Sequence, residues 1–294
     1  MKREIIAALS IVLFSMTACT KEKSLKSENE MKFTASYSST PLTKATSLFS
    51  FGNKATVYGY PAEADLAGSI PIAGTPIELT AVTNGNLTSV MPLYLPKGSY
   101  DFYSVSLNEP ISPGITFNSN YSEQLINGKD YLWAKDINIG SGGTASFVYE
   151  HKAVGVEVSI STGEGINYIE VTSIKITPAK PDALSKMSLS TGEIGVSSVK
   201  DNLTSMVLNS QKGQYIMLPL SGQSLDIEVM ANVKIGDITA NNKIYTASVP
   251  IMNYESGYFY TINLKITSSS MHFSGSIVND WIEQTLPQIT LTEN

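Results

Sequence analysis

An alternation of apolar and polar residues with a period of two most limits how this chain can fold. In the run 258–266, apolar residues stand at every even position from Tyr258 to Ile266. Successive side chains of a β-strand point to opposite faces, so this run predicts a strand with one buried face. The run 31–37 also alternates, which predicts a strand with one buried and one wet face. Similar strand-like runs cover residues 55–60, 100–107, 131–139, 144–149, 154–160, 168–176, 214–220, 225–233 and 243–250. Gly, Asn and Pro separate these runs, and the sequence has no sustained amphipathic helix pattern, so we predict an all-β chain of β-sandwich type.

The chain has 294 residues, a length that is sufficient for two domains. The strand pattern breaks at Ser161-Thr162-Gly163-Glu164-Gly165, and we place the domain boundary there. We expect the run 144–149 to pair with the run 154–160 inside the first domain. The prediction is therefore an N-terminal β-sandwich over residues 46–163 and a C-terminal β-sandwich over residues 164–294.

The N-terminus resembles the export signal of a bacterial lipoprotein. Lys2-Arg3 is basic, Ile5–Phe14 is apolar but too short to span a bilayer, and Met16-Thr17-Ala18-Cys19 resembles a lipobox. We predict that residues 1–18 are a signal peptide and that Cys19 carries the lipid that holds the protein at the outer membrane. The alternative is ordinary cleavage before this Cys, which would leave a free thiol. Cys19 is the only Cys in the chain, and a lone thiol is a liability in an oxidising compartment unless it is acylated.

Composition and motifs argue against a nucleic-acid-binding protein and against an enzyme. Charged residues make up 16% of the chain, the net charge is -6 and no basic patch is present, so nucleic acid is not expected as a partner. The two histidines, His151 and His272, lie outside any HxxxH or HExxH pattern, and the chain has no GxSxG motif. Asp136–Gly140 lacks the distant Glu of a calcium loop. We predict no catalytic residues, no metal site and no cofactor.

Four stretches of the chain together resemble one protein family. Gly257–Leu264 contains a G-Y-x-Y strand, and Met271–Trp281 ends in V-x-D-W. Phe147–Val158 and Met217–Leu220 are similar to two further strands of the same family. In their order along the chain, and together with the lipoprotein-like start, these stretches resemble the fimbrillins of Gram-negative anaerobes. The resemblance implies two tandem transthyretin-like (Greek-key) β-sandwich domains, export as a lipoprotein, cleavage in the first loop by a trypsin-like protease, and assembly by strand donation.

The same resemblance assigns roles to both ends of the chain. Residues 19–45 would form a lipidated tether and a removable N-terminal strand, with proteolytic processing between Lys44 and Ala45. A solvated loop lysine is the alternative reading of Lys44, because the family usually carries Arg at this site. In the C-terminal segment, the candidate donor-strand residues are the apolar ones, Ile282, Leu286, Ile289 and Leu291. The alternative is that this segment permanently closes the second sandwich.

The function implied is that of a fimbrial (pilus) structural or adhesion subunit, exposed on the cell surface at the outer membrane. Its partners would be other fimbrial subunits, the outer membrane through lipid, and a host or bacterial surface receptor. Two alternatives are an uncleaved, lipid-anchored fimbrial anchor, and a glycan-binding surface lipoprotein that uses exposed Tyr and Trp. We expect most tyrosines, as well as Trp133 and Trp281, to lie in the core instead.

Overall fold

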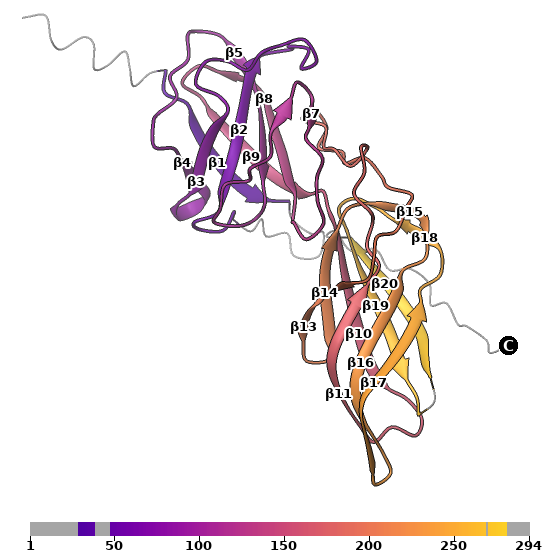
Figure 1. The fold of residues 1–294 in the computed structure, drawn as a ribbon. Helices are drawn as coiled ribbons and strands as arrows, with labels where there is room; N and C mark the ends of the chain where they lie inside the picture. The colour runs from indigo at the N-terminus through magenta and orange to yellow at the C-terminus, as the bar shows by residue number, and fades with distance from the viewer. Residues whose placement is uncertain (1–28, 39–47, 269, 281–294) are drawn as a thin grey trace, which may run out of the picture.

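The computed structural model describes residues 29–38, 48–268 and 270–280. Within these residues the regular structure is β-strand, apart from one 3₁₀ turn, η1 (Thr83–Gly85). The prediction of an all-β chain is confirmed. The strands gather into two bodies placed end to end, so the molecule is elongated (Figure 1). No helix in the described part of the chain is long and apolar enough to cross a bilayer.

The first body is a closed ring of seven strands. In ring order they are β1 (Lys32–Tyr37), β4 (Asn86–Thr88), β3 (Ile77–Ala81), β2 (Lys54–Pro61), β5 (Ser99–Ser106), β8 (Leu132–Gly140) and β9 (Thr144–His151). β1 closes this ring, because it lies between β4 and β9. Each strand contributes inward side chains to one apolar core, in which Phe102, Phe147 and Tyr149 are fully buried.

The second body is built from two facing sheets. The larger sheet has the order β13 (Val207–Asn209), β14 (Lys212–Met217), β10 (Val154–Thr162), β19 (Tyr258–Ile266) and β20 (Met271–Asp280). The smaller sheet has the order β12 (Thr204–Ser205), β11 (Tyr168–Ile176), β16 (Asp226–Ile235) and β17 (Ile238–Ser248). A separate pair, β15 (Leu220–Gln223) and β18 (Met252–Tyr254), lies at the end nearest the first body (Figure 1).

β10 is the central strand of the larger sheet. It pairs antiparallel with β14 on one side and parallel with β19 on the other. Val156 and Val158 are completely buried, as expected for a strand that is covered by neighbours. Gly155 lies against the ring of Phe259, and any larger side chain at this position would collide with that ring. The second body therefore depends on a strand that comes directly after the last strand of the first body.

The expected pairing of the runs 144–149 and 154–160 is wrong. β9 pairs with β1 and, at its C-terminal end, with β8, whereas β10 joins the second body. The two runs follow each other in sequence, but the short link Lys152-Ala153 carries the chain from one body to the other. The strand pairing thus divides the bodies at this link rather than at position 163. Alternation in the sequence shows which side chains face inward, but it does not identify the neighbouring strand. The transthyretin-like topology of the two bodies stays a prediction.

The two bodies share a continuous apolar cluster and specific hydrogen bonds. The cluster extends from Tyr58 and Tyr60 of the first body to the central residues of the second. The indole Nε1 of Trp133 donates to the carbonyl oxygen of Leu189 across the junction, at 2.8 Å. Asn127 lies in the long connection between β5 and β8, and it receives a hydrogen bond from the N–H of Leu218 at 2.8 Å. The junction is therefore packed like a core and not like a flexible linker.

Candidate functional site

β1 is held on both edges, but unequally. Its six residues pair in parallel with β9, from Lys32 opposite Thr144 to Tyr37 opposite Tyr149. On the other edge only Phe33 and Thr34 pair with β4. Removing β1 would therefore expose the edge of β9 over residues 144–149 and a short part of β4, and it would open the ring. An unpaired strand edge of this kind is a template for another strand.

The inward face of β1 fills an apolar slot. Met31, Phe33 and Ala35 alternate along the strand, and each has 5% or less of its surface exposed. The Phe33 ring makes an edge contact with Phe102 at a centroid distance of 5.6 Å and stacks on Phe147 at 6.2 Å. The predicted strand at 31–37, with one buried and one wet face, is confirmed. The slot that this strand occupies is the candidate functional site.

A polar circuit fixes the C-terminal end of β1. The hydroxyl of Tyr37 donates to Oδ1 of Asn108, and Nδ2 of Asn108 donates to Oδ2 of Asp130 at 2.9 Å. Nδ1 of His151 lies 2.7 Å from Oδ1 of Asp130, and the His151 ring stacks on the Tyr37 ring at 6.3 Å. The circuit ties β1 to the beginning and the end of the connection between β5 and β8. His151, which lies outside any catalytic motif, thus helps to hold the C-terminal end of β1 in place.

Sequence reasoning missed Asn108 and Asp130. Asn108 adopts a left-handed backbone conformation with φ 58°, which Asn tolerates better than most residues. The only signal in the sequence was the turn at Asn108-Glu109-Pro110, which predicts a strand end but not a hydrogen-bond partner. Nothing local in the sequence connects Asn108 with Tyr37 or His151.

A buried tyrosine forms part of the slot's floor. Tyr149 is completely buried, and its hydroxyl lies 2.6 Å from Oγ of Ser104. Burial raises the pKa of Tyr149 far above its ordinary value, while the hydrogen bond with Ser104 opposes this only in part. The floor therefore stays uncharged, as a slot for apolar side chains requires.

The N-terminal half of β1 borders an open cavity of about 300 Å³. The cavity lies where the pairing with β4 is short, and Met31, Phe33, Leu87, Pro92 and Leu93 contribute to its wall. The cavity therefore opens beside the end of β1 at which the chain enters the first body.

Several predicted site residues lie outside the described residues. These are Cys19, Lys44 and Ala45 at the N-terminal end, together with Ile282, Leu286, Ile289 and Leu291 and also Trp281 in the C-terminal segment. Their roles stay predictions. The described chain ends at Asp280, which pairs with Tyr258 at the start of β19. Gly257, next to Tyr258, donates its N–H to Ala153 in the link between the bodies, so the C-terminal segment begins near the junction.

The described aromatic residues do not gather into a ligand platform. Trp133 is buried, as predicted, and Lys152 lies over its ring at 5.0 Å. The three most exposed tyrosines, Tyr94, Tyr121 and Tyr168, belong to three separate parts of the fold. No group of three or more His, Cys, Asp or Glu side chains among the described residues could hold a metal ion.

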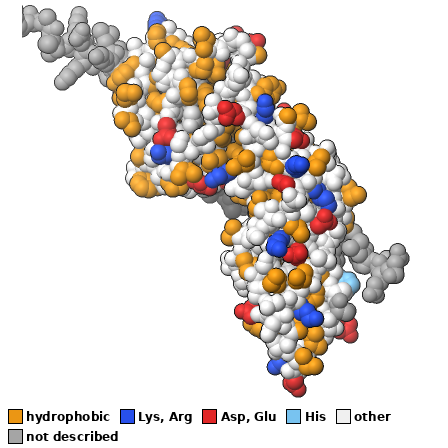
Figure 2. All heavy atoms as spheres, viewed as in Figure 1, with side chains coloured by type: hydrophobic (Ala, Val, Ile, Leu, Met, Phe, Trp, Pro, Cys, Tyr) orange, Lys and Arg blue, Asp and Glu red, His pale blue; other side chains and the backbone are white. Residues whose placement is uncertain are grey.

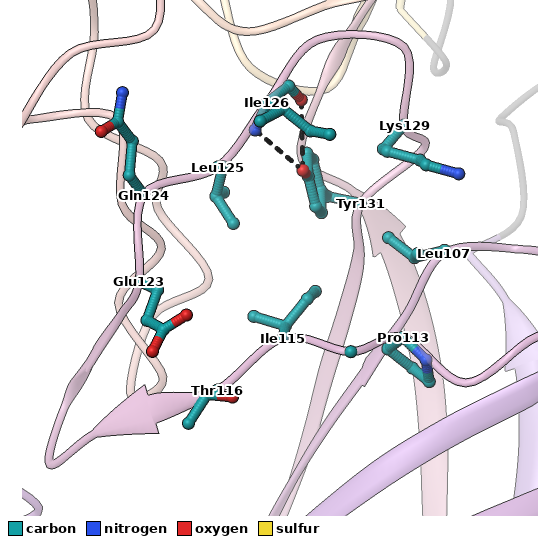
Figure 3. A pocket seen from close by; sticks show the side chains of 11 residues that line it. Leu107, Pro113, Ile115, Thr116, Glu123, Gln124, Leu125, Ile126, Lys129 and Tyr131 are labelled. Atoms are coloured by element: carbon teal, nitrogen blue, oxygen red, sulfur yellow. Dashed lines mark hydrogen bonds between the residues drawn. The ribbon is translucent and has the colours of Figure 1, made fainter.

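A small cavity of about 200 Å³ lies in the connection between β5 and β8 (Figure 3). Its walls are mainly apolar, with Leu107, Ile115 and Leu125 pointing toward one another. The hydroxyl of Tyr131 is bound to the backbone N–H and carbonyl oxygen of Ile126, so it offers little to a ligand. Glu123 and Lys129 stand on the rim. The cavity is an irregularity of the connection rather than a second candidate site.

The comparison with solved structures shows the fold. A candidate cell adhesion protein from Bacteroides uniformis is 15% identical, with a TM-score of 0.61, and the match covers 86% of this chain and 98% of that one. A candidate cell adhesion protein from Bacteroides ovatus is 16% identical, with a TM-score of 0.60, over 87% and 98%. A fimbrial protein from Bacteroides vulgatus is 12% identical, with a TM-score of 0.53, over 86% and 99%.

The comparison of sequences identifies the family. No curated protein matches the chain. The family model described as fimbrillin-like matches residues 23–281, which is most of the sequence and includes both bodies, β1 and the slot. The resemblance found in the sequence alone is thereby confirmed, and the chain belongs to the fimbrillin-like family.

Proposed function

We propose that the chain is a fimbrial subunit that is exported as a lipoprotein and joins a fibre by β-strand addition. Membership of the fimbrillin-like family and the fold shared with cell adhesion and fimbrial proteins support a fimbrial role. Its place is then the cell surface, and its partners are other fimbrial subunits. In this proposal, cleavage after Lys44 frees β1 from the rest of the chain, and a strand from a neighbouring subunit replaces it.

One observation carries this proposal: β1 fills the slot of the first body, although it is the first strand that the structure describes and a long stretch of sequence separates it from β2. Its inward residues Met31, Phe33 and Ala35 belong to the core of the first body, yet the strand precedes the rest of that body in sequence. Both Lys44 and the nearest described residue after it, Leu48, lie beyond the end of β1. A cut at Lys44 would therefore leave intact all seven strands of the ring that the structure describes. Strand addition would restore the lost backbone hydrogen bonds and refill the slot.

Limited proteolysis tests the processing step. We expect a trypsin-like protease to convert the purified mature protein into a form that begins at Ala45 and then polymerises on incubation. The variant Lys44→Gln should stay uncut at this position and monomeric, whereas Lys97→Gln, at an exposed lysine of the first body, should behave like the wild type. N-terminal sequencing and size-exclusion chromatography supply the measurements. Protein taken from the cell surface that begins at Cys19 would contradict processing and favour an uncleaved, lipid-anchored subunit.

Labelling with palmitate tests the anchor separately. We expect the wild-type chain to incorporate labelled palmitate and to fractionate with the outer membrane. The variant Cys19→Ala should incorporate none and stay soluble in the periplasm. A wild-type chain that takes up no palmitate, together with a variant that still fractionates with the membrane, would show that the lipobox reading is wrong.

A further inference from the structure

The loop between β4 and β5 exposes apolar side chains at the end of the first body that lies away from the second. Val90 is fully exposed, Met91 is 75% exposed and Tyr94 is 45% exposed. Together these three residues form the distal patch. In the space-filling view, hydrophobic side chains are exposed over the first body, and acidic and basic side chains are few and scattered (Figure 2). Exposed apolar residues that cluster in this way mark interaction surfaces.

The turn that carries the distal patch is held by a hydrogen bond and by two buried leucines of the same loop. The hydroxyl of Ser89 donates to the carbonyl oxygen of Met91 and shapes the turn that presents Val90. Leu93 and Leu95, in the same loop, are buried in the core of the first body. A partner would therefore meet side chains that are already in place, so binding requires little ordering of the loop.

The distal patch also lies where the chain enters the first body. The backbone N–H of Leu95 donates to the carbonyl oxygen of Asn29 at 3.2 Å, and Glu30 forms a β-bridge with Tyr94. Ten residues lead from Cys19 to Asn29. A chain of this length reaches about 35 Å when fully extended and has a mean span of about 17 Å when flexible. A lipid on Cys19 would therefore hold the distal patch within about 35 Å of the bilayer, and on average much nearer.

We propose that the distal patch docks into the interface of the membrane that holds the Cys19 lipid. This inference rests on the proposed lipid anchor. Val90 and Met91 would enter the boundary between headgroups and acyl chains, and Tyr94 would lie at headgroup level, where tyrosine is enriched. Lys97 follows in the same loop and is exposed, which suits anionic headgroups. The tether raises the local concentration of membrane around the patch, so weak insertion of a few side chains is sufficient.

Depth-dependent quenching tests the docking independently of natural acylation. The full mature chain would carry Cys19→Ser and an N-terminal hexahistidine tag, which binds it to vesicles of phosphatidylethanolamine, phosphatidylglycerol and a nickel-chelating lipid. A bimane label would be attached at Met91→Cys. The matched control is Ile238→Cys, because Ile238 is equally exposed at 73% but lies at the β16–β17 turn, at the far tip of the second body.

We expect brominated lipids to quench the label at position 91 at least twofold more than the label at position 238, and the emission at 91 to shift to the blue. Equal quenching at the two positions overturns the docking. A label at 91 that is shielded from aqueous iodide but not quenched by the lipid also overturns it, because a protein or a second copy then covers the patch. Palmitate labelling of the unmodified chain fails or succeeds independently of this result, so the anchor and the docking are judged separately.

Discussion

Replacing Phe33 by Ala should destabilise the uncut protein more than any other single change in β1. The side chain is 5% exposed and packs between two rings of the slot, Phe102 and Phe147. Truncating a buried Phe to Ala costs about 3–5 kcal/mol, because apolar burial is lost and a cavity remains. Urea denaturation followed by near-UV circular dichroism measures this loss. At a slope of about 3 kcal/mol per M, the unfolding midpoint should fall by about 1–1.7 M.

Thr34→Ala is the matched control on the same strand. Thr34 points outward, and its hydroxyl donates to Oγ of Ser146 at 3.1 Å in an exposed hydrogen bond. Losing one such bond costs about 1 kcal/mol or less, so the midpoint should move by about 0.3 M at most. If Phe33→Ala and Thr34→Ala shift the midpoint equally, β1 does not fill the slot in solution. That result would contradict the proposed role of the slot in strand addition.

Two further predictions concern the second body. A fragment of residues 153–294 should give a β-type far-UV spectrum and a cooperative transition, whereas a fragment of residues 166–294 should not, because only the first contains the central strand β10; equal folding of both would contradict the observed pairing. Burial opposes ionisation of Glu157, but hydrogen bonds from Lys212 and Gln214 outweigh it and lower the pKa of this carboxyl. Its stabilising contribution is therefore present above the unfolded-state pKa and is lost as the pH falls through the lower folded-state value. Glu157→Gln should flatten the acid limb of a stability–pH curve measured by urea midpoints, and an unchanged limb would refute the role of this ion pair.

The sequence was informative about strands and faces. The alternation over 258–266 predicts β19 with the observed bounds, and its even-numbered residues from Tyr260 onward are buried. Pro219 in the run 214–220 predicts an edge strand or a strand end, because proline has no N–H for the ladder, and β14 stops at Met217. These features depend on neighbours in the sequence, so a local pattern is sufficient to detect them.

The sequence was much less informative about strand partners and the polar circuit. β1 pairs with β9, and Thr34 and Ser146 are 112 positions apart. The alternation of the run 144–149 is equally compatible with any neighbouring strand that has one buried face. The contact of Tyr37 with Asn108 likewise depends on the closure of the whole ring. Periodicity encodes burial, whereas long-range pairing is decided by the three-dimensional packing of all strands.

The hydrogen bonds of β1 constrain any strand that replaces it. The N–H of Lys32 donates to the carbonyl oxygen of Gly143, just before β9, and the N–H of Ser38 donates to the carbonyl oxygen of Tyr149 in β9. Met31 donates on the opposite edge, to Leu93. The backbone N–H groups of even-numbered residues of β1 therefore face β9 and form the long ladder. Odd-numbered residues point their side chains inward, and their N–H groups face the opposite edge, where the pairing with β4 is short.

This rule makes a specific prediction for the C-terminal segment as a donor. If Ile289 takes the place of Phe33 in a neighbour's slot, Leu291 takes the place of Ala35 and Pro287 that of Met31. The proline then lacks only the N–H that faces the sparsely paired edge, so the ladder with β9 stays complete. Ile289→Asp should abolish polymerisation after protease treatment, whereas Thr290→Asp, which faces outward in this register, should polymerise like the wild type. Sedimentation of the fibres measures both. Should Thr290→Asp block assembly while Ile289→Asp allows it, the segment would enter in the opposite register, and Pro287 would interrupt the ladder with β9.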